Sequence, residues 1–389
     1  MSKPKTYFTT HHSPFTNSPL TTHQMPDHLT PDRPEYIEQL RADIRGVPYR
    51  PAKRKRNRDV QPVDPEAARY LFTVFTGNRW MELGNREPAA KMLFGEFWYQ
   101  HELCFLFANT NTGKSILAVQ IGNAIARGTK SGRFPCEAPA AKVLYADFEL
   151  SNLQFHRRYS TAGTDPDSYR DHFHDNFFRA QFNPAAGNPE GYREADDEFL
   201  IAGLEYRIQQ LKVTVLIIDN ISCLGGGTGN AVGALRIMNR LNALRAEYKL
   251  SILVLAHTPK RRNPAQPLSA NDLHGSKLLM NFADSAFTIG VSNTDNSLRY
   301  LKQIKQRSTQ QVYGDDNVCL CRINKFHNFL KFGFEGNSAE RLHLLSREQV
   351  QREQLTEQVV QLSAEGSTQR QISEELNISV GLVNKLLNN

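Results

Sequence analysis

The chain has 389 residues, 40% of them apolar, and a formal net charge of +7. This length fits one large domain with appendages or two domains, and the apolar content suffices for a real core. No apolar run approaches the roughly 18 residues of a membrane span, and the polar N-terminus is unlike an export signal, so we expect a cytoplasmic protein without membrane contact. The positive charge permits a nucleic-acid partner without requiring one.

The cysteines are scattered along the chain, at Cys104, Cys136, Cys223, Cys319 and Cys321. The last two are two positions apart in a strand-like run and therefore share a face, which is not the spacing of a zinc site. We expect reduced, buried thiols rather than a metal site or a disulfide framework.

The N-terminal segment, residues 1–62, is rich in Thr, Pro, His and Ser and poor in large apolar residues, which predicts a disordered arm. One short helix is expected within it, around Pro34–Arg45. A basic run, Lys53–Arg58, ends the arm, and it is compatible with a solvated linker or with a contact to a phosphate backbone. Residues 63–97 form a predicted helical lead-in, because the pattern from Pro65 to Phe97 is helical.

Residues 98–345 alternate strand and helix patterns and predict a central α/β domain. The early strands are short, continuous apolar runs, which is typical of a mostly parallel sheet that helices cover on both faces. The late strands look like hairpins and should add antiparallel members. The predicted strands are Leu103–Ala108, Lys142–Asp147, Val213–Asp219, Leu250–His257, Ala286–Val291, Arg299–Lys305, Val318–Asn324 and Phe329–Phe334.

The first predicted strand leads into a polar loop that ends in Gly113-Lys114-Ser115, and Ile116–Arg127 continues as a helix. In a loop of this kind, backbone N–H groups surround the phosphates, the lysine reaches the β and γ phosphates, and the serine coordinates Mg²⁺. Ala108 stands where the usual motif has Gly, and an ordinary strand–turn–helix with an exposed lysine is the alternative. The predicted ATP-binding residues are Ala108, Asn109, Thr110, Asn111, Thr112, Gly113, Lys114, Ser115 and Ile116.

Acidic residues end the next two predicted strands. Asp219 closes the third strand, and at the carboxyl end of a parallel strand it can hold Mg²⁺ through water. Glu149 follows the second strand and is a candidate for the base that activates the attacking water. Asp147 competes for that role, and the alternative is an acid that caps a helix beginning near Ser151.

These elements, in this order, resemble the RecA-like ATPases, and especially the hexameric replicative helicases of the DnaB and plasmid RepA types. The resemblance covers Trp98 to Phe334 and implies a RecA-like fold and a homo-oligomer, such as a hexameric ring. It implies that Glu149 is the catalytic acid and that His257, which closes the fourth strand, senses the γ phosphate. It also implies that Lys305 and Arg307 form a finger that reaches the ATP of a neighbouring subunit.

The late elements have plainer alternatives. His257 alone is compatible with an ordinary strand-end histidine, and Lys305 and Arg307 with a solvated strand face, because residues i and i+2 share a side. Two further segments are candidate DNA contacts. Leu273–Lys277 resembles the mobile segment where related helicases contact DNA, and the basic loop Lys260–Pro267 could line a DNA channel.

Residues 350–389 predict a small all-α domain of three helices, Thr356–Ala364, Thr368–Leu376 and Ser379–Leu387, which looks like a helix-turn-helix. Its core would consist of Ile372, Leu376, Ile378, Val383 and Leu386. Its DNA-facing residues would be Ser379, Val380, Gly381, Asn384 and Lys385. From Arg347 onward there are four basic and six acidic residues, a net charge of −2, so docking of a protein is the alternative to DNA.

The leading hypothesis is an oligomeric, DNA-linked ATPase that acts in replication, mobilisation or repair, as a helicase or a loader. The second is a site-specific DNA-binding regulator in which ATP only switches assembly. A third, a P-loop kinase of a small molecule, lacks a lid segment and leaves the Lys-x-Arg pair and the terminal helices unexplained.

Overall fold

The computed structural model describes residues 72–160, 172–183, 197–224, 231–259, 265–275, 278–345 and 347–388. The chain divides after Arg86 into two compact units. The described part of the first unit contains helix α2 (Gly77–Arg86), and the rings of Phe75 and Trp80 meet edge to face there while both stay about half exposed. The predicted disordered arm, with its short helix and its basic run, lies outside the described residues.

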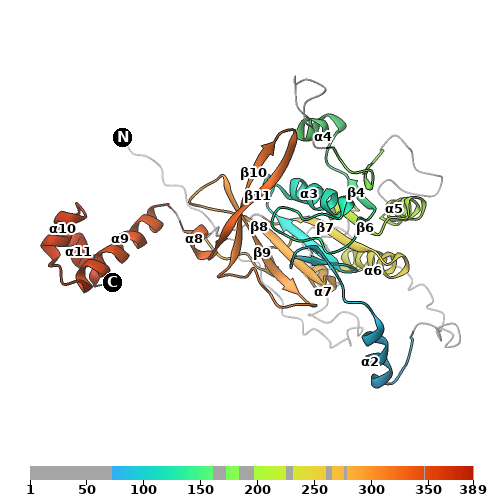
Figure 1. Ribbon diagram of the computed structural model, residues 1–389, viewed down its shortest axis with the longest axis horizontal. Helices are drawn as coiled ribbons and strands as arrows, with labels where there is room; N and C mark the ends of the chain where they lie inside the picture. The colour runs from blue at the N-terminus through green and yellow to red at the C-terminus, as the bar shows by residue number, and fades with distance from the viewer. Residues whose placement is uncertain are drawn as a thin grey trace, which may run out of the picture. The chain divides into compact units, whose positions relative to one another are not determined.

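A nine-stranded sheet organises the described residues of the second unit, in the order β11-β10-β9-β8-β3-β7-β6-β4-β5 (Figure 1). From β8 to β5 every neighbouring pair is parallel, and β9, β10 and β11 continue the sheet in antiparallel fashion. The predicted α/β fold with a mainly parallel sheet is confirmed and is consistent with a RecA-like fold. The strands are β3 (Leu103–Ala108), β4 (Val143–Asp147), β5 (Phe177–Gln181), β6 (Val215–Asp219), β7 (Ser251–His257), β8 (Ser285–Val291), β9 (Leu298–Gln306), β10 (Val318–Phe326) and β11 (Phe329–Ser338).

Helices cover both faces of this sheet (Figure 1). One apolar core lies between α3 and the sheet and includes Leu117 and Tyr145, while the other lies under α5, α6 and α7 and includes Ile201 and Leu241. Because both faces are covered, β3, β4 and β6 are buried at every position, as their continuous apolar runs predicted. The helices and turns of this region are α3 (Lys114–Arg127), α4 (Asn152–Tyr159), α5 (Asp197–Leu211), η2 (Ile221–Cys223), α6 (Ala231–Tyr248), η3 (Ala270–Asp272), α7 (Leu278–Phe282) and α8 (Arg341–Leu344).

The helical pattern predicted up to Phe97 is wrong beyond Arg86. A short antiparallel pair, β1 (Met92–Phe94) and β2 (Trp98–Tyr99), replaces it. Gly95 lies between these strands with a φ of +47°, a left-handed conformation that a helix interior does not contain. The aromatic side chains around it are buried on all sides rather than along one stripe, so core packing decides the local structure.

Strand β5 was absent from the sequence prediction. It is a half-buried edge strand that pairs only with β4 among the described residues, with Val143 opposite Phe177. Its sequence carries Arg179 and Gln181 in place of a continuous apolar run. Short, polar edge strands give a weak signal because one side of their backbone needs no partner.

The C-terminal residues fold as three helices, α9 (Arg347–Ala364), α10 (Gln369–Glu375) and α11 (Val380–Leu387). The first is longer than predicted, and the other two agree with the prediction within one residue. The Thr368 and Ser379 side chains cap α10 and α11 as their positions suggested. The five predicted core residues all belong to one apolar cluster: Ile372, Leu376, Ile378, Val383 and Leu386.

The cysteines are free thiols, and each is buried or half-buried. Burial is the largest cause that raises the pKa of Cys104, Cys321 and the three others, so none of these thiols is activated as a thiolate. Within the described ranges, no helix has the length and apolar character needed to cross a bilayer.

Candidate nucleotide site

The carboxyl ends of four parallel strands, β3, β7, β6 and β4, lie side by side in the sheet. Ala108 at the end of β3 pairs in register with His257 at the end of β7, and Asp147 of β4 pairs with Asp219 of β6. In open α/β sheets, ligands bind in the crevice beyond the carboxyl ends of the strands. The register therefore brings the predicted phosphate loop, both acids and the predicted sensor to one place.

Lys114 lies folded over its own loop at the first turn of α3. Its Nζ donates to the carbonyl oxygens of Ala108 and Asn109, both at 2.9 Å, and lies 3.3 Å from His257 Nδ1. Burial lowers the pKa of Lys114, and the nearby carboxylates oppose that shift. The lysine is thus held beside the amino end of a 14-residue helix, where free N–H groups and the helix dipole attract anions.

The conformation of the loop requires glycine at position 113, and side chains of β10 and β11 pack against this position. Gly113 has a φ of +105°, and an added Cβ would lie 2.5 Å from Ile323 Cδ1 and 2.9 Å from Phe332 Cζ. The hairpin of β10 and β11 therefore lies directly over Gly113. Ala108 is fully buried and is the last residue of β3. It has no positive φ, so the glycine of the usual motif is not required there.

Asp219 is a buried carboxylate with two hydroxyl neighbours. The Tyr145 hydroxyl donates to Oδ2 at 2.6 Å, and the Ser115 hydroxyl lies close enough to lower the pKa of this carboxylate. Burial raises the pKa of Asp219 to about 6, and the hydrogen bonds from Ser115 and Tyr145 oppose the rise. A serine hydroxyl beside a desolvated carboxylate is an oxygen donor set that suits Mg²⁺, whose charge would offset the burial of Asp219.

Asp147 is occupied by structural contacts. Its Oδ1 accepts from the N–H groups of Glu149 and Leu150 at 3.1 and 2.9 Å, and its Oδ2 pairs with Arg179 Nε at 2.8 Å. The side chain is completely buried. Arg179 also donates to the Leu150 carbonyl, so one guanidinium fixes the whole turn after β4. Asp147 therefore holds the segment that presents Glu149, and its burial closes it to solvent water.

Glu149 has the opposite surroundings, because its side chain is 38% exposed and its carboxylate faces the site. Its Oε1 contacts Asn220 Nδ2 and lies 3.4 Å from His257 Nε2. Asn220 Nδ2 in turn lies 3.0 Å from His257 Nε2. With Lys114 on the other ring nitrogen, these groups form one polar chain from the phosphate loop to Glu149.

Arg307 lies at the opposite ends of the parallel strands, beside the amino ends of β3 and β8. Its N–H donates to the Asp284 carbonyl at 3.0 Å, and the Asp284 N–H donates to Leu103, the first residue of β3, at 2.9 Å. The phosphate loop begins after Ala108, so the six residues of β3 separate the two places by about 20 Å. The Arg307 side chain is 53% exposed, and its guanidinium contacts Asp284 Oδ1 and the Asn281 carbonyl.

Lys305 lies near the same strand ends as Arg307. Its Nζ donates to the Met280 carbonyl of α7 at 2.7 Å, and burial lowers the pKa of Lys305. The structure thus brings Lys114, Glu149, Asp219 and His257 together and leaves the predicted Lys-x-Arg pair outside the site of its own chain.

The segment between β7 and β8 starts beside the site. The His274 N–H donates to the His257 carbonyl at 2.8 Å, which anchors the segment to the end of β7. Earlier in the same segment, the Leu268 carbonyl accepts from the buried Lys302 Nζ at 2.8 Å. Within the two segments predicted to contact DNA, residues 260–264 and 276–277 lie outside the described residues.

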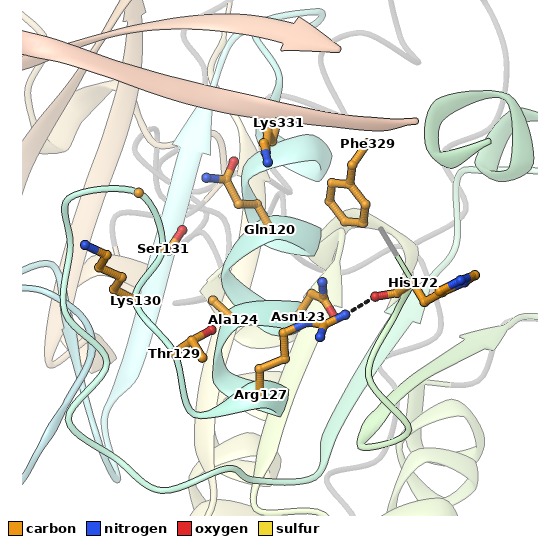
Figure 2. A pocket seen from close by; sticks show the side chains of 11 residues that line it. Gln120, Asn123, Ala124, Arg127, Thr129, Lys130, Ser131, His172, Phe329 and Lys331 are labelled. Atoms are coloured by element: carbon orange, nitrogen blue, oxygen red, sulfur yellow. Dashed lines mark hydrogen bonds between the residues drawn. The ribbon is translucent and has the colours of Figure 1, made fainter. Parts of the chain in front are cut away.

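A separate cavity of about 460 Å³ lies at the far end of α3 from the loop (Figure 2). Figure 2 shows Arg127, in the last turn of α3, reaching the His172 carbonyl, with Phe329 and Lys331 of β11 on another side. Cations such as Arg127 and Lys130 are favoured at the carboxyl end of a helix by its dipole, so they are explained without a bound anion. We therefore keep this cavity apart from the candidate site.

Four site residues were missed by the sequence prediction: Tyr145, Arg179, Asn220 and Arg299. The last donates from Nε to the Thr112 carbonyl at 2.9 Å and so steadies the phosphate loop from β9. Asn220 had a usable signal, because it directly follows Asp219 at a strand end. The others act across the sheet, and no local pattern marks them.

Comparison with known proteins agrees with this geometry in coarse terms. No curated protein matches the chain. Residues 72–263 match the family model described as AAA domain. That span contains Lys114, Glu149, Asp219 and His257, and it ends before β9, which Arg307 directly follows. The AAA domain is a P-loop ATPase domain, so the match supports nucleotide binding and ATPase activity at this edge of the sheet.

Proposed function

We propose that this protein binds ATP with Mg²⁺ at the loop around Lys114 and hydrolyses it between neighbouring copies of the chain while acting on DNA. The observation that carries the proposal is the polar chain from Lys114 through His257 and Asn220 to Glu149. It connects a phosphate-binding lysine to an exposed carboxylate through a histidine. Phosphoryl transfer to water depends on positioned charges and an oriented water, and these groups can supply both.

Binding uses groups that are already in place. Lys114 exchanges the carbonyl oxygens of its loop for the β and γ phosphate oxygens, and the amino end of α3 faces the same anion. Ser115 and Asp219 hold Mg²⁺, which neutralises charge on the phosphate oxygens when it is bound. His257 lies between the lysine and Glu149, where it can respond to the γ phosphate.

Glu149 is the proposed general base, and Asp147 is not. Both of the Asp147 oxygens are taken by the turn and by Arg179, whereas the Glu149 carboxylate is open to the site. A base must reach the proton it removes through a direct or one-water contact, and only the open carboxylate can do so.

The proposed finger acts in trans. Arg307 lies about 20 Å from the loop of its own chain, measured along β3, so it can serve only the ATP of a neighbour. Its guanidinium is half exposed and its planar charge matches a transferring phosphoryl group. The proposed assembly is a homo-oligomer, with the hexameric ring that the helicase resemblance implies.

The proposed DNA contact lies on the C-terminal helices, as a helix-turn-helix. The residues predicted to face DNA are exposed, and they are Ser379, Val380, Gly381, Asn384 and Lys385. We assign the protein to replication, mobilisation or repair, as a helicase or loader. A strand-displacement assay separates this role from that of an ATP-switched regulator, which would bind duplex DNA without unwinding it.

The first prediction concerns nucleotide binding. Lys114→Ala should abolish binding of a fluorescent ATP analogue, because the cation that reaches the β and γ phosphates is removed. Lys130→Ala, an exposed lysine beyond the other end of α3, is the matched control and should bind normally. Wild-type affinity in Lys114→Ala would refute the site.

The second prediction separates the two acids. Glu149→Gln should keep ATP bound and slow hydrolysis by roughly two decades or more, the usual effect of losing a general base. Asp147→Asn should instead lower the melting temperature, because it weakens the contact with Arg179 that holds the turn. Steady-state kinetics and thermal melts of both variants decide which of the two acids is the general base. A stable, nucleotide-bound but inactive Asp147→Asn, beside an active Glu149→Gln, would reverse the assignment.

The third prediction concerns the tail. Deleting residues 347–389 removes α9, α10 and α11 whole and should weaken binding of duplex DNA while leaving basal ATPase activity intact, since the site lies among residues 108–257. Fluorescence anisotropy at several salt concentrations measures the loss. Unchanged affinity with unchanged salt dependence would mean that DNA is read elsewhere, with Lys53–Arg58 as the next candidate.

The fourth prediction tests catalysis between subunits. Arg307→Ala should bind ATP normally and lose on the order of a thousandfold in rate, the usual contribution of an arginine finger. Mixing it with Glu149→Gln creates interfaces in which both residues are intact, so two nearly inactive proteins should regain activity together. If mass measurements show mixed oligomers and the mixture stays inactive, Arg307 does not act in trans.

A further inference from the structure

Asn220 directly follows the proposed metal ligand and is 2% exposed. Its amide orientation is fixed by the backbone, because Oδ1 accepts a hydrogen bond from the Ser222 N–H at 2.9 Å at the start of η2. An oxygen held in this way leaves the NH₂ group on the opposite side, facing the site. Asn220 is therefore a donor toward the nucleotide.

The NH₂ group has two hydrogens and meets two acceptors. One is Glu149 Oε1, and the other is His257 Nε2 at 3.0 Å. Asn220 is the only described residue that hydrogen-bonds both of these side chains. It connects the segment after β4 to the end of β7 from a third strand, β6, so it fixes the position of the Glu149 carboxylate relative to the histidine.

Lys114, Asn220 and the Glu149 carboxylate all lie beside the His257 ring, and the first two make incompatible demands on its proton. If Nε2 accepts from Asn220, the neutral ring carries its proton on Nδ1. Lys114 Nζ lies 3.3 Å from that same Nδ1, and an ammonium group needs a lone pair there. While Lys114 rests on its loop, both contacts cannot be satisfied at once.

We propose that Asn220 is a positioning residue that holds Glu149 for catalysis and fixes the proton of His257 on Nδ1 once Lys114 turns to the phosphates. Nδ1 is the ring nitrogen on the phosphate-loop side, where Lys114 Nζ now lies, so this tautomer points a donor at the γ phosphate. Nucleotide binding removes the competing lysine, and Asn220 then links the histidine to Glu149. The inference rests on the proposed function, in which Glu149 is the base.

The test uses Asn220→Asp in the full-length protein. The new side chain keeps the oxygen that accepts from Ser222 and replaces the NH₂ donor with a second oxygen, which repels Glu149. We expect kcat to fall by about tenfold to a hundredfold, as for other residues that orient a reacting group. The affinity for a non-hydrolysable ATP analogue with Mg²⁺ should stay within about twofold. Asn220→Ala removes the donor without adding charge and should lower kcat in the same way.

Two comparisons make the result specific. Asn317→Asp is the matched amide-to-acid control, since its Nδ2 donates to the Val312 carbonyl in a loop beyond β9, away from the candidate site. In the double variant with Glu149→Gln, the Asn220→Asp change should lower the residual rate by less than it does alone, because the part of its effect that runs through Glu149 is already lost.

Each other outcome overturns the inference. Wild-type kcat in both Asn220 variants, with Glu149→Gln inactive, removes the role of Asn220 and leaves the proposed function standing. A parallel loss of analogue affinity and melting temperature would mean that Asn220 only supports the strand end beside Asp219. Independent, multiplicative losses in the double variant would mean that it does not act through Glu149. If Glu149→Gln is fully active, the base assignment fails and this inference fails with it.

Discussion

The candidate site depends on the hydrogen-bond register of the parallel strands. Ala108 is level with His257, and Asp147 is level with Asp219, because β3 pairs with β7 and β4 with β6 without a shift. A slip of one residue in either pair would turn the side chains to the other face of the sheet. The apolar runs of these strands, buried on both faces, therefore set the geometry of the charged groups at their ends.

Buried polar groups hold this edge in a defined arrangement. Arg179 and Asp147 fix the turn that carries Glu149, and the Tyr145 hydroxyl orients Asp219. Such groups are costly to bury unless every one of them has partners, and here the partners are also the residues that the site needs. The same contacts that keep the strand ends stable leave Glu149 with a partly exposed side chain.

The local parts of the site could be predicted from the sequence, and the parts that act across the sheet could not. A strand, a polar loop with Gly113 and Lys114, and a helix are adjacent in the chain, so their pattern was readable. Asp219 and His257 were readable as polar residues closing apolar runs. Arg179 lies in an edge strand with no clear signal, and Asn220 gains its role only when β4, β6 and β7 lie side by side. The position of Arg307 at the far edge likewise follows from the reversed direction of β9.

The central claim is that the edge formed by β3, β7, β6 and β4 binds ATP with Mg²⁺. The most direct measurement is a structure of the protein with a non-hydrolysable ATP analogue and Mg²⁺. The account predicts that Lys114 Nζ leaves the carbonyl oxygens of Ala108 and Asn109 for the β and γ phosphates, with the metal beside Ser115 and Asp219. An analogue bound in the cavity at the far end of α3, with Lys114 still on its loop, would contradict it.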